Sequence, residues 1–179
     1  MLALAISPNN QTLYFAGDFA LVNGHSRRNA AAVSSGIGTL RAWSLAATAD
    51  VVGDLAVSAS GNTVFAGGRG AGGYAQAYGP TTGGTPVWNV QTNGDVEALA
   101  IASSTLYVGG HFTTVGGADR GHLAALSASG GLLSWAPDAD GVFGAVDAAI
   151  TSSRVVFGGE FTTVAGAAHQ GVAQFSGAA

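Results

Sequence analysis

Four polar side chains follow one short motif that occurs four times in the chain. Each stands directly after an apolar run that ends in glycine, as in Leu-Tyr-Val-Gly-Gly (106–110) before His111. The four residues are Asp18, Arg69, His111 and Glu160. Their types suit the binding of a polar ligand, and two carboxylates on either side of a sugar can hydrolyse a glycosidic bond. We therefore expect a ligand-binding face, or alternatively a set of strand-end residues that bond to neighbouring parts of the chain.

A second set of polar residues stands eight positions after the phenylalanine that closes the motif. Its members are Arg27, Arg120 and His169. They predict either a structural contact that holds the long loop of each copy, or a basic patch for an acidic ligand. Because the whole chain has only six lysine and arginine residues, such a patch would be thin.

The chain offers weak evidence for a metal and none for a catalytic residue. Asp138 and Asp140 begin like a calcium loop, but the twelfth position, which should be a bidentate acid, is Ala149. We expect a polar turn there, with calcium as the weak alternative, and no other cofactor. His111 and His122 can face each other across one hairpin base, but a metal site would need a third ligand. No G-x-S-x-G nucleophile motif occurs.

The elements that must position these residues are copies of a repeat of about 47 residues. The apolar motif begins at 13, 64, 106 and 155, and one tryptophan occurs in each complete copy, at 43, 88 and 135. Each copy holds short runs of strand-forming residues separated by Asn-Gly, Gly-Gly, Ser-Gly or Asp-Gly turns. Since no window shows sustained helical periodicity, the pattern predicts four short antiparallel strands per copy.

Four strands in 40 to 50 residues are typical of a β-propeller blade. We predict one all-β domain over 1–179, with blades at about 1–49, 50–94, 95–141 and 142–179. Three blades should have four strands and the last one three. Because a single blade cannot cover both of its faces, neighbouring blades must stack. Three arrangements stay open: a piece of a longer propeller, half of an eight-bladed ring of two chains, or a closed four-bladed ring.

The copy that spans 106–120, 123–128 and 132–137 resembles the delta-60-type β-propeller repeats of large secreted or surface bacterial proteins. The resemblance covers essentially the whole chain, and the second copy departs from it most. It implies a propeller in an extracellular or cell-envelope setting and transfers no catalytic residue. The tryptophan-bearing stretch is also distantly similar to quinoprotein and WD-type blades, but the acidic cluster that holds quinone and calcium in quinoproteins is missing.

Composition limits the classes of partner. Charged residues make up 9% of the chain, against about 25% in ordinary soluble domains, and the net charge is −4. This argues against a nucleic-acid binder that works by phosphate neutralisation. No apolar run reaches 18 residues, so we expect no membrane insertion. The sequence favours a non-catalytic binding or scaffold module with a protein or carbohydrate ligand, able to form a homo-oligomer. The alternative is a carbohydrate-binding, hydrolytic or lyase propeller that uses the face of Asp18, Arg69, His111 and Glu160.

Overall fold

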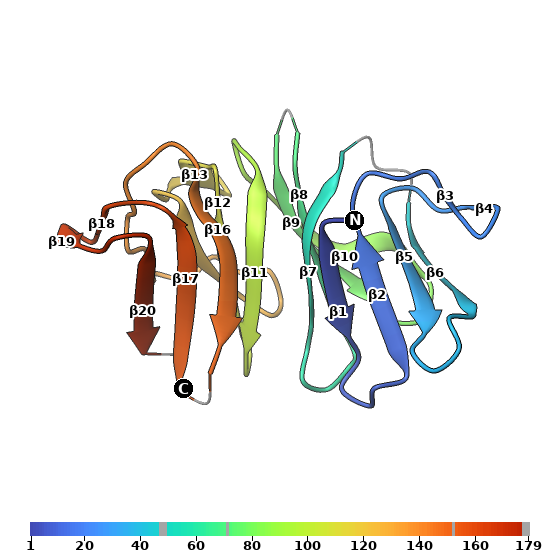
Figure 1. Cartoon of the computed structure of the whole chain (residues 1–179). Coiled ribbons are helices and arrows are strands. Elements are labelled where there is room, and N and C mark those ends of the chain that lie inside the picture. Colours follow the sequence, from blue (N-terminus) through green and yellow to red (C-terminus); the bar gives the residue numbers. More distant parts are fainter. Residues whose placement is uncertain (47–49, 71, 152, 177–179) are drawn as a thin grey trace.

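The computed structural model describes residues 1–46, 50–70, 72–151 and 153–176. All regular secondary structure within these ranges is β-strand, which confirms the all-β prediction. The described residues include no helical segment able to span a bilayer. The strands fall into four consecutive antiparallel units (Figure 1).

Units 1 and 2 each contain four antiparallel strands that are neighbours in chain order. Those of unit 1 are β1 (Ala3–Ile6), β2 (Thr12–Ala16), β5 (Ala30–Ser34) and β6 (Leu40–Leu45). Those of unit 2 are β7 (Val52–Val57), β8 (Val64–Gly68), β9 (Tyr74–Gly79) and β10 (Gly83–Gln91). The aromatic and β-branched residues of β2 and β8 favour this extended form.

Units 3 and 4 each contain a three-stranded antiparallel sheet. Unit 3 has β11 (Val96–Ala102), β12 (Thr105–Gly110) and β15 (Leu123–Ser127). Unit 4 has β16 (Gly144–Ile150), β17 (Arg154–Glu160) and β20 (Val172–Ser176). The three strands predicted for the last copy are therefore present.

The fourth strand predicted for the third copy, at 131–136, is not a regular strand. An isolated bridge between Leu126 and Leu132 joins this segment to β15, with backbone bonds from Leu133 N to Ala125 O (2.9 Å) and from Ser127 N to Gly131 O (2.7 Å). The segment lies between two glycines and Pro137, which has no N–H to donate, so the ladder is not extended. Trp135 of this segment still packs edge-on against Tyr107, with ring centroids 5.2 Å apart.

The long loops of units 1, 3 and 4 contain small hairpins that the sequence analysis treated as irregular. They pair β3 (Leu21–Val22) with β4 (His25–Ser26), β13 (Thr114–Val115) with β14 (Ala118–Asp119), and β18 (Thr163–Val164) with β19 (Ala167–Ala168). Two residues at positive φ make each of these turns, such as Gly116 (φ 57°) and Gly117 (φ 81°), and in unit 4 the first of them is Ala165 (φ 50°).

Units 1 and 2 share one eight-stranded sheet, because β10 pairs with β6 in parallel at Gly83–Ser44 and Gly84–Leu45. A Cβ on Gly83 would lie 2.4 Å from the carbonyl oxygen of Ser44, so this close approach requires glycine. The end strands of the sheet, β1 and β7, also contact each other. The sheet therefore curls into a nearly closed, barrel-like form, which the sequence analysis did not predict.

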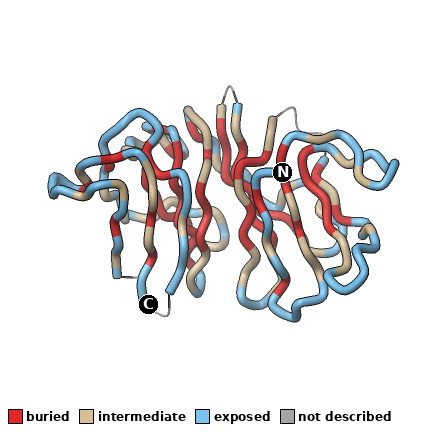
Figure 2. Tube along the Cα trace, in the orientation of Figure 1, coloured by how far each residue is buried: buried red, intermediate tan, exposed pale blue. Residues whose placement is uncertain are grey.

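The first strands of the four units, β1, β7, β11 and β16, contact one another in that order and line one side of the molecule (Figure 1). Three buried apolar clusters lie between successive units (Figure 2). Each cluster combines alanines and an aromatic residue of one unit with larger apolar residues of the next. For example, Ala98, Ala100 and Tyr107 of unit 3 meet Phe157 and Phe161 of unit 4. Face-to-face stacking of like units thus forms the core.

Candidate ligand-binding groove

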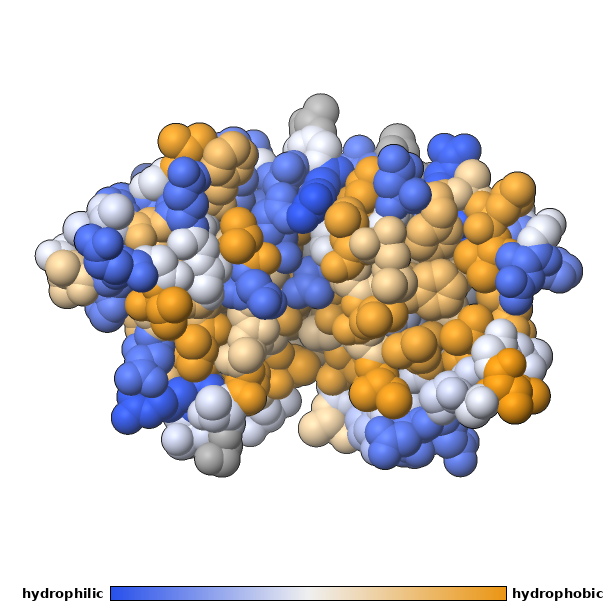
Figure 3. All heavy atoms as spheres, in the orientation of Figure 1, coloured by the Kyte–Doolittle hydropathy of each residue, from blue (hydrophilic) through white to orange (hydrophobic). Residues whose placement is uncertain are grey.

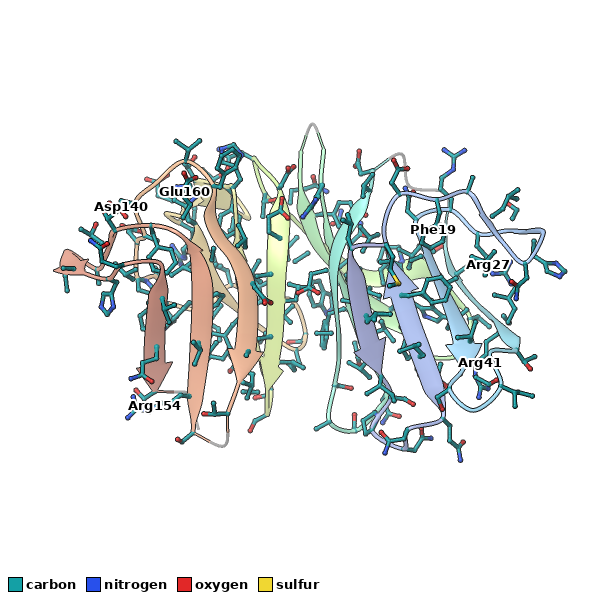
Figure 4. The ribbon with its side chains drawn as sticks, viewed as in Figure 1. Phe19, Arg27, Arg41, Asp140, Arg154 and Glu160 are labelled. Carbon is teal, nitrogen blue, oxygen red and sulfur yellow. The ribbon has the colours of Figure 1, made fainter. Side chains whose placement is uncertain are left out.

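The structure places the four predicted ligand-binding residues at equivalent strand ends, but it does not gather them into one site. Each lies at or just beyond the end of β2, β8, β12 or β17. Figure 4 shows Glu160 and Phe19, the neighbour of Asp18, on opposite sides of the molecule. The carboxylates of Asp18 and Glu160 belong to units 1 and 4, so this pair does not have the arrangement that sugar hydrolysis needs.

Arg69 and His111 do lie near one another, because both interact with Glu97 of β11. The Arg69 guanidinium forms an ion pair with the Glu97 carboxylate. Burial raises the pKa of Glu97, and the positive charge of Arg69 opposes this shift. Asp95 also raises the pKa of Glu97, whereas His111 lowers it. The sequence analysis missed Glu97, since its site candidates came from the ends of the second strands and from the loops that follow them.

His111 is exposed and lies over a buried histidine. Its ring stacks on the ring of His122, with centroids 6.5 Å apart and planes 14° from parallel, as the hairpin spacing predicted. The ring of the exposed Phe143 also lies near His111, with the two ring centroids 5.5 Å apart. His122 is held by a 3.0 Å contact between Nδ1 and the carbonyl oxygen of Gly110. The imidazole nitrogens of His111 have no hydrogen-bond partner among the described residues, so they remain available to a ligand.

A groove of about 490 Å³ opens beside this histidine stack, where units 2, 3 and 4 meet. Its walls include the backbone of Gly70 and Gly94 and the side chains of Asp95, His111 and Val142. Asp95 Oδ1 accepts a hydrogen bond from Gly70 N (2.8 Å), which fixes the loop of unit 2 against the connection to unit 3. The groove therefore combines ring faces with a carboxylate and exposed backbone groups, a mixture that suits a polar ligand.

Two matching caps hold the loops around the groove. Asn93 Oδ1 accepts hydrogen bonds from the backbone N–H groups of Thr113 and Thr114, both at 2.8 Å. Asp140 Oδ1 accepts from the N–H groups of Thr162 and Thr163, both at 2.7 Å. These bonds hold the pKa of Asp140 at about 2, well below its usual value. The connections into units 3 and 4 thus each cap the hairpin loop of the unit that they enter.

The weak calcium candidates take part in such structural bonds. Asp138 Oδ1 accepts a hydrogen bond from Gly121 N at 2.9 Å, and Asp140 accepts the bonds just described. Within the part of the chain that the structure describes, no three His, Cys, Asp or Glu residues come together in a way that would hold a metal ion.

The second predicted set, Arg27, Arg120 and His169, holds equivalent places in the hairpin loops. In each case the backbone N–H donates to the start of the same loop, as from Arg120 N to Thr113 O (2.9 Å). The two guanidinium groups also reach across to the next segment of their own unit. Arg27 Nη2 donates to Arg41 O (3.1 Å), and Arg120 Nη2 donates to Leu133 O (2.9 Å). These contacts match the structural alternative for the two arginines.

A larger groove, of about 930 Å³, lies at the opposite end of units 1 and 2. Hydroxyl and amide side chains from the strand-connecting turns line it, with Tyr14 and Arg41. The Tyr14 hydroxyl donates to Pro80 O at 2.9 Å and so joins the two units there. The sequence analysis did not select these residues, because turn serines, threonines and asparagines are common in any turn-rich chain.

No protein-family model matches the chain, and no curated protein matches it. Solved structures do resemble its fold. The computationally designed Ika4 protein superposes with a TM-score of 0.64 at 16% identity, over 98% of this chain and 89% of that chain. The computationally designed Ika8 protein superposes with a TM-score of 0.62 at 18% identity, over 90% of this chain. The aligned part is 43% of the Ika8 chain, so the present chain spans less than half of that protein.

Proposed function

We propose that the four units are consecutive blades of a β-propeller and that the chain is a non-catalytic binding module. The adjacent first strands and the apolar clusters between successive units support the propeller. The resemblance of the repeats to delta-60-type repeats supports a secreted or cell-surface setting for the module.

The observation that carries the binding function is the groove beside His111, at the meeting point of three units. Its walls include loops held by the Asn93 and Asp95 side chains. Loops on a rigid scaffold are preferred places for binding residues, because little ordering entropy is lost when the ligand arrives.

The chemistry of the groove favours a carbohydrate. The ring of His111 lines the groove and the exposed ring of Phe143 lies beside it, so the two can pack against the C–H face of a sugar ring. The nearby Asp95 carboxylate and the exposed amides can bond to hydroxyl groups. A peptide ligand is the second candidate, since the same backbone groups can bond to another main chain.

Glycan and peptide arrays probed with the purified chain test this function. We expect one class of array ligand to bind, and His111→Ala to weaken that binding at least about tenfold because it removes the imidazole that lines the groove. His25→Ala is the matched control, since His25 is an equally exposed histidine in β4 of unit 1. Absence of any bound ligand, or equal loss in both variants, would contradict the proposal.

A further inference from the structure

Unit 1 leaves one of its two faces without a neighbouring unit, and this face is apolar. Leu4 of β1 is 54% exposed, whereas its counterparts Leu55 and Leu99 in the next two units are 4% and 5% exposed. Ile6 on the same side of β1 is 51% exposed. Figure 3 shows the apolar surface that results over β1 and β2. In units 2 and 3 the equivalent surface packs against the preceding unit.

Two aromatic side chains continue this face of unit 1. Phe15 and Phe19 are only half-buried and pack on each other, with ring centroids 5.5 Å apart. Their counterparts in unit 4, Phe157 and Phe161, are 0% and 4% exposed in the cluster between units 3 and 4. Unit 1 therefore carries the residues of a unit interface at a place where the chain supplies no partner.

Unit 4 leaves the complementary face open. Val172 of β20 is 60% exposed, whereas its counterpart Leu123 in unit 3 is fully buried against unit 4. Asp147 and Ala149 of β16 are exposed on this side, where their counterparts Ala98 and Ala100 pack into the next unit. The two open faces are thus the two halves of one interface type that already occurs three times within the chain.

A hydrogen bond gives the direction and register of the contact. In unit 2, Asp54 Oδ1 accepts from Leu55 N (2.7 Å), and Asp54 Oδ2 accepts from Leu99 N (2.6 Å) of unit 3. Asp147 of unit 4 is the counterpart of Asp54, and its Oδ1 accepts from Ala148 N (2.8 Å) in the same way. Asp147 Oδ2 has no bond to a following unit among the described residues.

The missing donor is present at the other end of the molecule. Leu4 of unit 1 is the counterpart of Leu99, and no described residue accepts a hydrogen bond from its N–H. The residue directly before Leu4, and before its counterpart in each later unit, alternates between alanine and aspartate. In units 1 to 4 these residues are Ala3, Asp54, Ala98 and Asp147. Each alanine-bearing unit thus needs an aspartate from the unit before it. Unit 4 followed by unit 1 keeps this alternation.

We propose that the open face of unit 1 binds the open face of unit 4 of a second copy of this chain. Asp147 Oδ2 of one copy accepts the Leu4 N–H of the other, and the apolar side chains around Leu4 cover those around Val172. Within one chain β7 and β11 separate β1 from β16, so these two strands of the same chain do not make the contact (Figure 1). Two such contacts cover both open faces and close a pair of chains.

Sedimentation velocity of the purified chain tests the pairing. We expect a species of twice the 17.5 kDa chain mass. Leu4→Glu should shift this species to monomer by placing a carboxylate in the apolar contact, next to Asp147. Ile37→Glu is the control, because Ile37 is 87% exposed in a turn outside both open faces. Circular dichroism should show that both variants keep the β fold. A monomeric wild-type chain would overturn the proposal.

Crosslinking tests the direction of the contact. The chain has no cysteine, so Leu4→Cys and Ala149→Cys each introduce a single thiol. We expect a short bismaleimide to crosslink a mixture of the two variants, because their thiols lie on facing surfaces of different copies. Each variant alone should stay uncrosslinked. Crosslinking of Leu4→Cys with itself would show that like faces pair, which would also overturn the proposal.

Discussion

At the scale of single residues, Asn93 and Asp140 cap equivalent hairpin loops with different functional groups, an amide and a carboxylate. Both use one side-chain oxygen to accept two successive backbone N–H groups of a threonine pair. The second polar atom of each bonds to a threonine hydroxyl, Asn93 Nδ2 as donor and Asp140 Oδ2 as acceptor. The charge of Asp140 is therefore not essential to the cap, whereas the oxygen is.

This comparison predicts the effect of two substitutions at one position. Asp140→Asn should keep the loop of β18 and β19 ordered, because Asn93 already makes the same cap in unit 3. Asp140→Ala should leave the N–H groups of Thr162 and Thr163 without their acceptor. Hydrogen exchange at these two amides measures the result, with Thr113 and Thr114 as internal controls. Equal protection in both variants would show that the cap does not hold the loop.

A second residue-scale prediction concerns Asp54, whose pKa burial raises to about 6. Its hydrogen bonds to Leu55 N and Leu99 N oppose this shift, and nearby Asp147 and Glu97 add to it. The folded protein therefore holds a proton that the unfolded chain, with a carboxyl pKa near 4, releases. The resulting stability is complete below about pH 4 and is lost as the pH rises through about 6.

Urea unfolding at pH 4.5 and pH 7 measures this effect. We expect Asp54 to lower the free energy of unfolding by about 2 kcal/mol between these values. Asp54→Asn should flatten that dependence, because the amide does not titrate. Asp140 does not interfere, since its pKa of about 2 affects stability only in more acidic solution, where protonation weakens its cap. An unchanged pH dependence in Asp54→Asn would contradict the assignment.

At the scale of elements, the repeat alignment predicted most strands because alternating apolar residues and glycine turns are local signals. It placed β2, β8, β12 and β17 at equivalent points and predicted three strands for the last copy. It missed the parallel contact of β6 with β10, which depends on non-local packing between two units. It also predicted a strand at 131–136, where the apolar pattern is present but the structure has an isolated bridge in place of a regular ladder.

The candidate site was predictable only in part, because contacts between distant segments leave no local signal in the sequence. The alignment found His111 and Arg69 because they recur at one motif position. It did not reveal that Glu97 pairs with Arg69, or that Phe143 lies beside His111, since both contacts join different segments of the chain. Equivalent positions in a repeat share a place in their own unit, but their side chains can still lie far apart, as Asp18 and Glu160 do.

The connection between units 2 and 3 provides a prediction at this scale. A Cβ on Gly94 would lie 1.7 Å from the carbonyl oxygen of His111, so no side chain fits there without moving the backbone. Gly94→Ala should therefore destabilise the fold by about 3 kcal/mol and disturb the groove. Gly36→Ala is the control, because no atom lies within 4 Å of its added Cβ. Thermal unfolding that gave the same shift for both variants would argue against a tight connection.

At the scale of the whole molecule, stability comes from stacking between units. Each internal cluster joins two units, so each unit depends on its neighbours for burial of its apolar faces. Units 1 and 4 have only one neighbour each within the chain. Leu4, Ile6 and Val172 are exposed for this reason. Covering apolar surface of this extent with another surface lowers the free energy of the system.

A crystal structure of the purified chain would test the central claim of stacked units completed by a second copy most directly. We predict β1, β7, β11 and β16 in this order, with β16 of each copy beside β1 of the other and Asp147 bonded to Leu4 N of that copy. A single chain in which β16 packs on its own β1, or a pair joined through any other surface, would contradict the account.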